Sequence, residues 1–312
     1  RGYISRRYDP RDMVLSIAGD VDARLVVEEA ARVFGQYANR NVLQPVAMID
    51  LEGLQRGMAA DIRKGSWKKA FLSFSFPAPG SRHESAAAAD VLAHLLAGDD
   101  TALLQRKFRI ERPLVDDIDA SCMTFERAGI IMLSAQLDAG KAEEAVRDMA
   151  GLLSSLKADD FTDDQLKRAV LNLEDEYYRS KEKIAAIAET AGREFFYDPS
   201  SVGGARWIAE LQAVTKEKLQ QVIDRWIRRD ALTICALLPE KGEGDALDPT
   251  RVGGIVSEFW TAEASAAKGK RADPQSEREV IDLDGKRKII LMPDTSLPYV
   301  SAVLTYSGGE LL

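Results

Sequence analysis

A clear strand signal lies in the sequence KAFLSFSFPAPG, residues 69–80. Apolar and small polar residues alternate through it, so Leu72, Phe74 and Phe76 are predicted to face a core while the serines between them face the opposite side. Phe71 is the exception, because it adds an apolar residue to the polar side. The Pro-Ala-Pro-Gly sequence that follows cannot continue the strand and predicts its end.

Helices and further strands are predicted on both sides of this strand. A β-prone run at 13–18 leads into a helix that Asp22 caps and that continues to Phe34. The other strands are predicted at 59–63, 114–124, 129–137, 232–238, 286–292 and 299–306, and the other helices at 84–97, 102–109, after residues 138–140 as far as Leu156, at 163–196 and at 215–226. Strands that enclose helices in this order indicate an α+β fold and not a doubly wound parallel sheet.

The longest predicted helix spans residues 163–196. Thr162 and Gln165 form a capping box at its start. The apolar residues along it keep mostly to the three- and four-residue spacing of one helix face, which is typical of packing against a core. The charged runs at 174–176 and 181–183 are interpreted as its solvent face.

Two internal similarities indicate repeated units. Arg7–Asp12 and Arg225–Asp230 are similar basic, aromatic turns, and each leads directly into a strand. The strand, turn, strand and Gly order of 59–80 recurs in the strands predicted within 286–308. The chain is therefore interpreted as the end of one unit, a complete second unit and the opening of a third, with both chain ends cutting through domains. Chance matching of short patterns is the alternative.

The composition is ordinary for a globular protein, with 46% hydrophobic and 29% charged residues. A length of 312 residues predicts about two domains. The net charge of −8 argues against nucleic acid as a partner, because nucleic-acid-binding proteins concentrate Lys and Arg. No apolar run approaches the roughly 18 residues of a membrane span. Cys122 and Cys235 each lie in a largely apolar run and are predicted to be buried free thiols.

Several stretches resemble, in order, the M16 (insulinase and pitrilysin) family of zinc metallopeptidases. The sequence YDPRDMVLSIAGDVD (8–22) resembles the end of that family's first domain, and LLAGDDTALLQ (95–105) resembles the turn and helix of its second domain. Residues 112–121 and 211–240 continue the second domain, and 285–310 resembles the opening of the family's second half. Each motif is weak alone, and the order and spacing of all of them carry the resemblance.

The resemblance implies a fold and a division into domains. The fold is the LuxS and mitochondrial-processing-peptidase-like metallohydrolase fold, in which helices pack on a mainly antiparallel sheet. The chain would contain the C-terminal piece of a first domain (1–40), a second, non-catalytic domain (41–240), a linker (241–279) and the start of a third domain (280–312).

Family members that cut peptides carry His-x-x-Glu-His on a helix of the first domain, with a later Glu as third ligand. Two His four residues apart share a helix face and hold one Zn²⁺, and the Glu between them activates the bound water. This chain has only two His, His83 and His94, and no such motif. The sequence DVLAH puts Asp90 where the first His would stand and Ala93 where the Glu would stand. No catalytic or metal-ligating residue is therefore predicted, and His94 is interpreted as structural and His83 as a solvated or capping residue.

Other chemical candidates have ordinary structural interpretations. The acidic pairs at 99–100 and 116–117 are predicted to be solvated turn or edge residues, since adjacent strand residues point to opposite faces. The aromatic pair Phe259-Trp260, in the linker, is either a docking anchor or packs on a neighbouring domain. The glycine pairs at 203–204 and 253–254 are not followed by Lys-Ser/Thr, so they do not indicate a phosphate loop.

By resemblance, the leading hypothesis is a zinc-dependent metalloendopeptidase. Two homologous halves would enclose a chamber, hold a peptide as an added strand and cut it with metal-activated water. This segment would supply non-catalytic wall and hinge, with peptide substrate and the other domains of the same polypeptide as partners. Zinc is expected in the full-length protein and none in this chain.

Two alternatives remain open at this point. A degenerate family member could serve as a structural or assembly subunit, and a weaker reading is a peptide-binding module unrelated to proteolysis. The substrate-binding residues, the substrate preference and the oligomeric state are not determined by the sequence. A periplasmic location is only a tendency of bacterial relatives.

Overall fold

The structure, a computed structural model, describes residues 13–35, 57–197, 204–240, 247–260, 279–282 and 288–291. The chain divides into two units, Arg1–Lys268 and Gly269–Leu312. The predicted strand at 299–306 and the basic, aromatic turn at Arg7–Asp12 lie outside the described residues.

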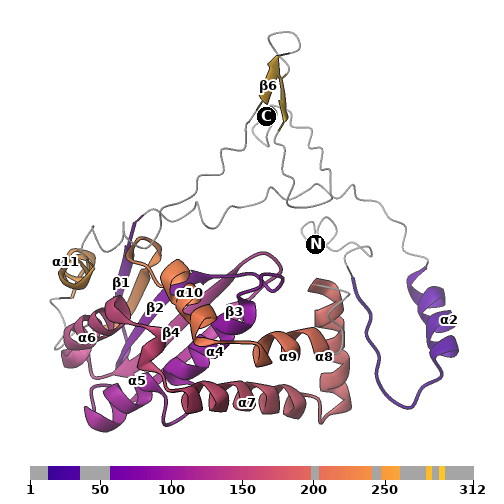
Figure 1. Ribbon diagram of the computed structural model, residues 1–312, viewed down its shortest axis with the longest axis horizontal. Coiled ribbons are helices and arrows are strands. Elements are labelled where there is room, and N and C mark those ends of the chain that lie inside the picture. Colours follow the sequence, from indigo (N-terminus) through magenta and orange to yellow (C-terminus); the bar gives the residue numbers. More distant parts are fainter. Residues whose placement is uncertain are drawn as a thin grey trace. The chain divides into compact units, whose positions relative to one another are not determined.

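A five-stranded sheet in the order β1-β5-β2-β4-β3 forms the centre of the first unit (Figure 1). Its strands are β1 (Ala59–Gly65), β2 (Ala70–Ala78), β3 (Asp117–Thr124), β4 (Gly129–Leu137) and β5 (Thr233–Pro239). β5 pairs parallel with β1, and the remaining neighbours pair antiparallel. The predicted α+β class with a mainly antiparallel sheet is confirmed. The end predicted for the second strand at Pro77 is wrong, because β2 continues through Pro77 and Ala78, which pair with Ile130 and Gly129.

The helices of this unit mostly follow the predicted order. They are α2 (Ala23–Phe34), α4 (Ala86–Ala97), α5 (Leu103–Gln105) with a π-helical turn at Arg106–Glu111, α6 (Ala142–Ser155), α7 (Asp163–Ser180), α8 (Ile184–Tyr197), α9 (Ala205–Gln212), α10 (Lys216–Trp226) and α11 (Pro249–Phe259). Thr162 and Gln165 form the predicted capping box at α7, and the hydroxyl of Thr215 caps α10. α9 is a helix that the sequence patterns do not reveal.

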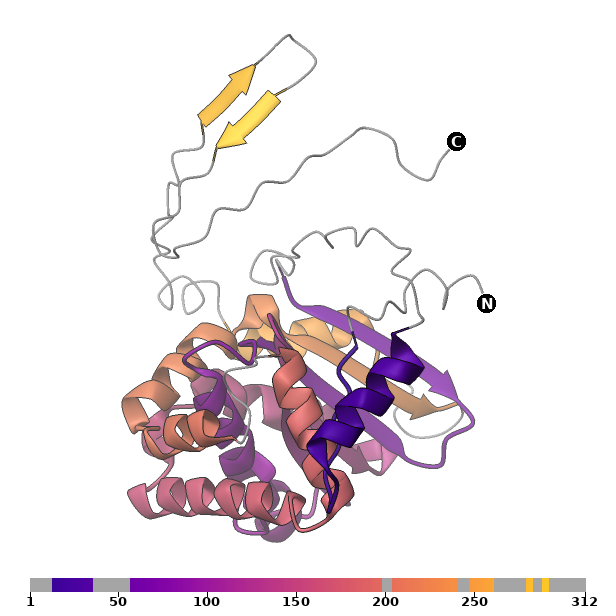
Figure 2. The same cartoon turned by 90° about the vertical axis from the view of Figure 1, so that its right-hand side faces the viewer.

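The alternation in β2 places one face of the sheet in the core. Leu72, Phe74 and Phe76 are buried, whereas Ser73 and Ser75 lie half-buried on the opposite face. The helices gather in a layer beside the sheet (Figure 2), with α4 against β3 and with α6 and α10 against β2. Every residue of α4 except Asp90 is buried. Burial of this apolar surface is the main stabilising contribution to the fold.

α11 follows β5 and packs against α6. Val252, Ile255 and Val256 are fully buried, and Trp260 at its C-cap is almost so. The ring of Phe259 lies over Gly151 of α6, where an added Cβ would stand 3.0 Å from it. The first part of the predicted linker thus contains a helix with its own apolar anchor.

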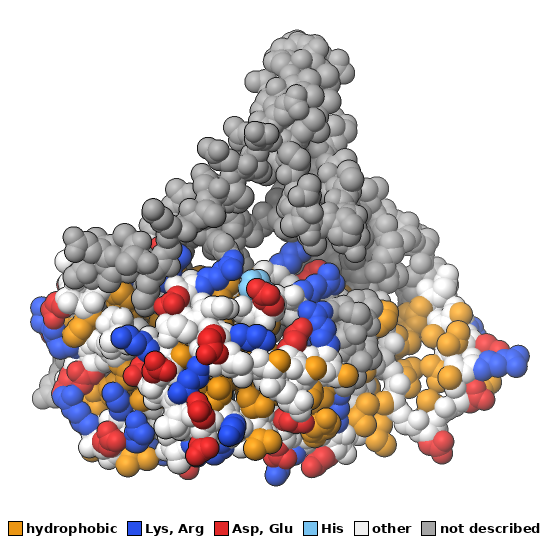
Figure 3. All heavy atoms as spheres, in the orientation of Figure 1, with side chains coloured by type: hydrophobic (Ala, Val, Ile, Leu, Met, Phe, Trp, Pro, Cys, Tyr) orange, Lys and Arg blue, Asp and Glu red, His pale blue; other side chains and the backbone are white. Residues whose placement is uncertain are grey.

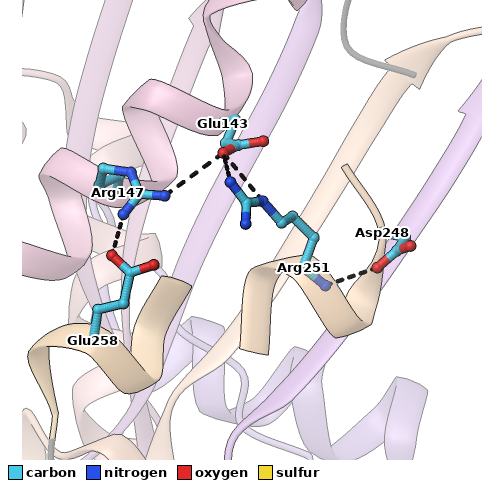
Figure 4. A network of polar contacts seen from close by, with 5 residues as sticks. All are labelled: Glu143, Arg147, Asp248, Arg251 and Glu258. Atoms are coloured by element: carbon cyan, nitrogen blue, oxygen red, sulfur yellow. Dashed lines mark hydrogen bonds and ion pairs between the residues drawn. The ribbon is translucent and has the colours of Figure 1, made fainter. Parts of the chain in front are cut away.

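Ion pairs also join α6 and α11 (Figure 4). Glu143 of α6 pairs with Arg251 of α11, and Arg147 pairs with Glu258 and, at 3.6 Å, with Glu143. Asp248 caps α11 by accepting the backbone N–H of Arg251 at 2.7 Å. Because these side chains are partly exposed, the apolar contacts contribute more than the charges do.

Two helices, α7 and α8, replace the single helix predicted at 163–196, so that prediction is wrong. The hydroxyl of Ser180 donates to the Tyr177 carbonyl at 2.7 Å, and the backbone N–H of Lys181 bonds to the Tyr178 carbonyl at 3.0 Å. No residue between Tyr178 and Ile184 is apolar. This interval therefore has no side chain that could hold a continuous helix against a core.

The strand predicted at 13–18 is also wrong for this chain, because these residues have no regular structure and pair with no strand in the described part of the chain. α2 begins after Asp22, whose carboxylate accepts the N–H groups of Arg24 and Leu25 as predicted. α2 has no buried residue, and Leu25 is 62% exposed. Val26, Ala30 and Val33 are half-buried, so the described residues cover its apolar side only in part.

The second unit contains a hairpin of β6 (Glu279–Asp282) and β7 (Lys288–Leu291), paired antiparallel. β7 lies within the predicted strand at 286–292, whereas β6 is a strand that the sequence patterns do not predict.

The described surface is mixed in charge. On the face shown in Figure 3, Lys and Arg side chains are interspersed with Asp and Glu, without a continuous basic patch. Among the described helices, none combines the length and the apolar character that crossing a lipid bilayer requires.

Replacing Phe74 by Ala should lower the free energy of unfolding by roughly 3–5 kcal/mol, because a buried ring is lost and a cavity remains. Phe71 on the same strand is 39% exposed, so Phe71→Ala should lower it by less than about 1 kcal/mol. Urea unfolding followed by circular dichroism measures both values. Equal losses would contradict the assignment of the two sheet faces.

Candidate functional site

Two residues of α4 are of a type that can bind a metal ion. Asp90 and His94 are four residues apart on this helix, and Ala93 stands between them. α4 packs against β3, α7 and α9, so both side chains meet residues from other elements.

His94 occupies a structural position. It is 7% exposed, and its Nε2 lies 3.3 Å from the amide Nδ2 of Asn172 on α7. Gly98 lies against the ring, since an added Cβ there would stand 2.3 Å from Nδ1. One ring nitrogen is therefore engaged by an amide and the other is closed off by backbone, in agreement with the structural interpretation.

Asp90 is held by residues of two other elements. Its Oδ2 accepts the indole N–H of Trp207 on α9 at 3.1 Å, and the thiol of Cys122 on β3 also hydrogen-bonds to the carboxylate. Burial raises the pKa of Asp90 to about 6, more than the two hydrogen bonds lower it. Burial and the Asp90 charge raise the pKa of the Cys122 thiol, which is therefore unreactive.

Tyr177 connects α7 to α8 and α9. Its hydroxyl donates to Glu194 Oε1 at 2.9 Å, and its ring lies 5.4 Å from that of Trp207, centroid to centroid. Burial, followed by the interaction with Glu194, raises the pKa of Tyr177. Gly204 has a φ of +72° and lies so close that an added Cβ would stand 1.6 Å from the Tyr177 hydroxyl. Only glycine fits this position.

These residues line two adjoining cavities between the end of β3 and helices α7, α8 and α9, which we name the α7–α9 cleft. The cavities measure about 590 and about 300 Å³. They share five lining residues: Thr124, Tyr177, Ser180, Arg193 and Trp207. Asp90 and Cys122 line the larger cavity only.

The donor set on α4 does not fit a catalytic zinc. A hydrolytic site needs three protein ligands and a carboxylate that activates water. Here Ala93 stands in the carboxylate position, His94 faces an amide, and Asp90 is bonded to Trp207. Over the described ranges, no three His, Cys, Asp or Glu side chains come close enough together to hold a metal ion.

The acidic pairs lie in a turn and at the sheet edge, as predicted. His83 lies in the turn before α4, where its Nδ1 accepts the Ser85 N–H at 3.0 Å, and the N-cap of the helix is Ser85. Asp99 accepts the N–H and hydroxyl of Thr101 in a turn, and Asp116 pairs with Lys69 at 3.0 Å.

Three other candidates are placed differently or only in part. Cys235 is exposed, so the prediction of a buried thiol is wrong for it. Burial alternates along β5, and Cys235 belongs to the exposed set. It pairs with Ser73 of β2 on the open face of the sheet. Gly253 and Gly254 lie inside α11, and Gly203 lies outside the described residues.

The residues that sequence reasoning missed come together only in three dimensions. Asn172 is 78 residues from His94, and Trp207 is 117 residues from Asp90. Neither belongs to a motif. The one available signal was Gly204, because glycine before a helix often marks a left-handed residue.

Residues 1–173 match the model of the Peptidase M16 inactive domain. The chain belongs to this family. The match agrees with the resemblance drawn from its motifs and with an α4 helix that carries no zinc-binding sequence.

Relatives and solved structures agree with this assignment. The chain is 21% identical to the zinc protease PqqE of Helicobacter pylori over 183 residues, which are 58% of this chain and 41% of that protein. A protease from Helicobacter pylori has the same fold, with a TM-score of 0.61, 15% identity and coverage of 71% of this chain and 54% of that one. The peptidase M16 inactive domain from Pseudomonas fluorescens has a TM-score of 0.60 and 17% identity, with coverage of 72% of this chain and 53% of that one. The chain thus spans about half of these relatives or less.

Replacing Asp90 by Asn should remove a pH dependence of stability. The folded-state pKa of about 6 lies above the ordinary value of 3.8, so the folded protein binds more protons between these values and wild-type stability falls as pH rises through this window. Asn stays neutral and keeps an acceptor for Trp207. As pH rises from about 4.5 to about 7.5, the free energy of unfolding of the variant should therefore increase by roughly 2 kcal/mol relative to that of wild type. Urea unfolding at the two pH values measures this difference.

Asp119→Asn is the matched control, because Asp119 is exposed on the same strand as Cys122. This variant should follow the wild-type pH profile. Parallel profiles of Asp90→Asn and wild type would disprove the raised pKa.

Replacing Gly204 by Ala should lower the free energy of unfolding by roughly 1–3 kcal/mol, because the methyl group meets the Tyr177 hydroxyl and the backbone is left-handed. Gly254→Ala in α11 has open space around the new Cβ, so it should raise stability by roughly 0.5–1 kcal/mol. Thermal unfolding distinguishes the two. A neutral Gly204→Ala would contradict the geometry of α9 and α7.

Proposed function

We propose that the chain forms the non-catalytic domain and the hinge of a zinc-dependent endopeptidase. The observation that carries this proposal is the α4 helix, which has Asp90, Ala93 and His94 where a hydrolytic helix needs His, Glu and His. Asp90 and His94 already have partners, Trp207 and Asn172, so neither is available to a metal without disturbing the packing. Hydrolysis would then belong to polypeptide outside this chain.

The proposed role as a wall rests on the open face of the sheet. Helices cover one face. On the other face, Cys235, Ser73, Ser134 and Asp119 form one row across the successive strands β5, β2, β4 and β3. Small polar side chains suit a surface that faces a water-filled chamber. Peptide substrate and the other domains of the polypeptide are the proposed partners.

The proposed division of the chain retains a first-domain piece at 1–40, a second domain at 41–240, a linker at 241–279 and the start of a third domain at 280–312. The largely exposed apolar side of α2 supports the first boundary, because such a helix needs another layer to cover it. α11 lies inside this linker and packs against α6, so the hinge would be the part of the linker that follows α11.

The second candidate is a structural or assembly subunit that has the fold without the metal. A chain of the complex III2 from Candida albicans has the same fold, with a TM-score of 0.57, 12% identity and coverage of 76% of this chain and 57% of that one. This likeness concerns the fold alone and makes an assembly role the natural competitor of the peptidase role.

Metal analysis and peptide cleavage separate these roles. After dialysis against zinc-free buffer, the 312-residue chain should retain less than about 0.1 Zn²⁺ per molecule and cleave no peptide, because its donors do not form a site. The intact polypeptide of which this chain is proposed to be a part should hold one Zn²⁺ and cut unstructured peptides.

One tightly bound Zn²⁺ in the 312-residue chain would overturn the non-catalytic assignment. An intact polypeptide without zinc and without cleavage would favour the assembly role. Replacing the Glu of any His-x-x-Glu-His in that polypeptide by Gln should abolish cleavage and retain the metal, which ties the activity to that site.

A further inference from the structure

The α7–α9 cleft has the size of a small-ligand site, since such sites measure roughly 300–1,000 Å³. Its two cavities, of about 590 and about 300 Å³, are joined by their shared lining residues. Residues of β3, α7, α8 and α9 converge on it, so it is built by tertiary packing and not by one loop. Gly204 lets α9 approach Tyr177 closely enough to close its floor.

Most charged groups in the cleft already have partners. Arg206 pairs with Glu210 at 2.8 Å, Glu194 accepts from Tyr177, and Asp90 accepts from Trp207. These contacts rigidify the walls and leave little net charge.

Two residues of opposite charge in the larger cavity remain without a partner among the described residues. Arg193 of α8 and Glu176 of α7 both line it, and neither has a hydrogen-bond or ion-pair partner within the part of the chain that the structure describes. They do not pair with each other either. A guanidinium and a carboxylate that line one cavity without pairing suit a ligand that carries both an anion and a cation.

The same cavity also has apolar lining residues. Met123 and Phe125, at the end of β3 and just beyond it, are each 48% exposed, and Leu173 of α7 lines the cavity with them. Large apolar side chains exposed beside unpaired charges are typical of a binding surface.

We propose that the α7–α9 cleft binds a short peptide with free ends and an apolar side chain. The peptide carboxylate pairs with Arg193, its ammonium group pairs with Glu176, and its apolar side chain packs on Met123 and Phe125. The binding needs no zinc and no peptidase activity, so it stands independently of the proposed function.

Isothermal titration calorimetry of the 312-residue chain with the tripeptide Ala-Ala-Leu tests this proposal. The peptide with free ends should bind, and amidation of its C-terminus or acetylation of its N-terminus should each weaken binding at least about tenfold, because each modification removes a charge-assisted pair.

Two substitutions assign each end of the peptide. Arg193→Gln should weaken binding of the free peptide about as much as amidation does, and should remove the difference between the acid and amide forms. Glu176→Gln should do the same for the free and acetylated forms. Arg179→Gln is the control, since Arg179 is exposed on α7, pairs with Asp175 and does not line the cleft.

Circular dichroism of each variant verifies that the fold is kept, and both altered residues are exposed on helix surfaces. Equal binding of the acid and amide forms, or unchanged binding by Arg193→Gln, would overturn the proposal, as would no binding of the free peptide at millimolar concentration. None of these results bears on whether the intact polypeptide holds zinc and cuts peptides.

Discussion

Burial of one face of the antiparallel sheet beneath α4 is the constraint on which the remaining structure depends. Alternation in β2 makes that face apolar. The short alanine side chains of α4 let this helix pack closely on the sheet. Because α4 is buried on nearly every side, any polar residue on it must find its partner inside the protein. Asp90 and His94 are these residues, and Trp207 and Asn172 are the partners.

This arrangement explains why the two polar side chains of α4 have structural roles. An imidazole that faces an amide and a carboxylate that faces an indole are satisfied hydrogen-bonding groups, so they contribute to packing and not to catalysis. The space that α7, α8 and α9 enclose around them persists because Tyr177 and Gly204 hold α9 close to α7. A domain called inactive for one reaction therefore still presents a shaped polar cavity.

Most of the sheet and its covering helices could be predicted, and the failures have physical causes. The strand expected at 13–18 has no partner in the described chain, and the helix expected at 163–196 breaks where apolar side chains are missing. Cys235 lies in an apolar run, yet strand alternation turns it to the open face. Local pattern predicts the kind of element well and its exposure less well, because exposure depends on which neighbours cover it.

By itself the sequence determined the α+β class, the family resemblance and the lack of a His-x-x-Glu-His motif in these 312 residues, because periodicity and spacing are local properties. Only the tertiary structure decided that Asp90 meets Trp207 across 117 residues and that Arg193 and Glu176 line one cavity. These contacts depend on how helices from distant parts of the chain cross, and no local pattern encodes that crossing.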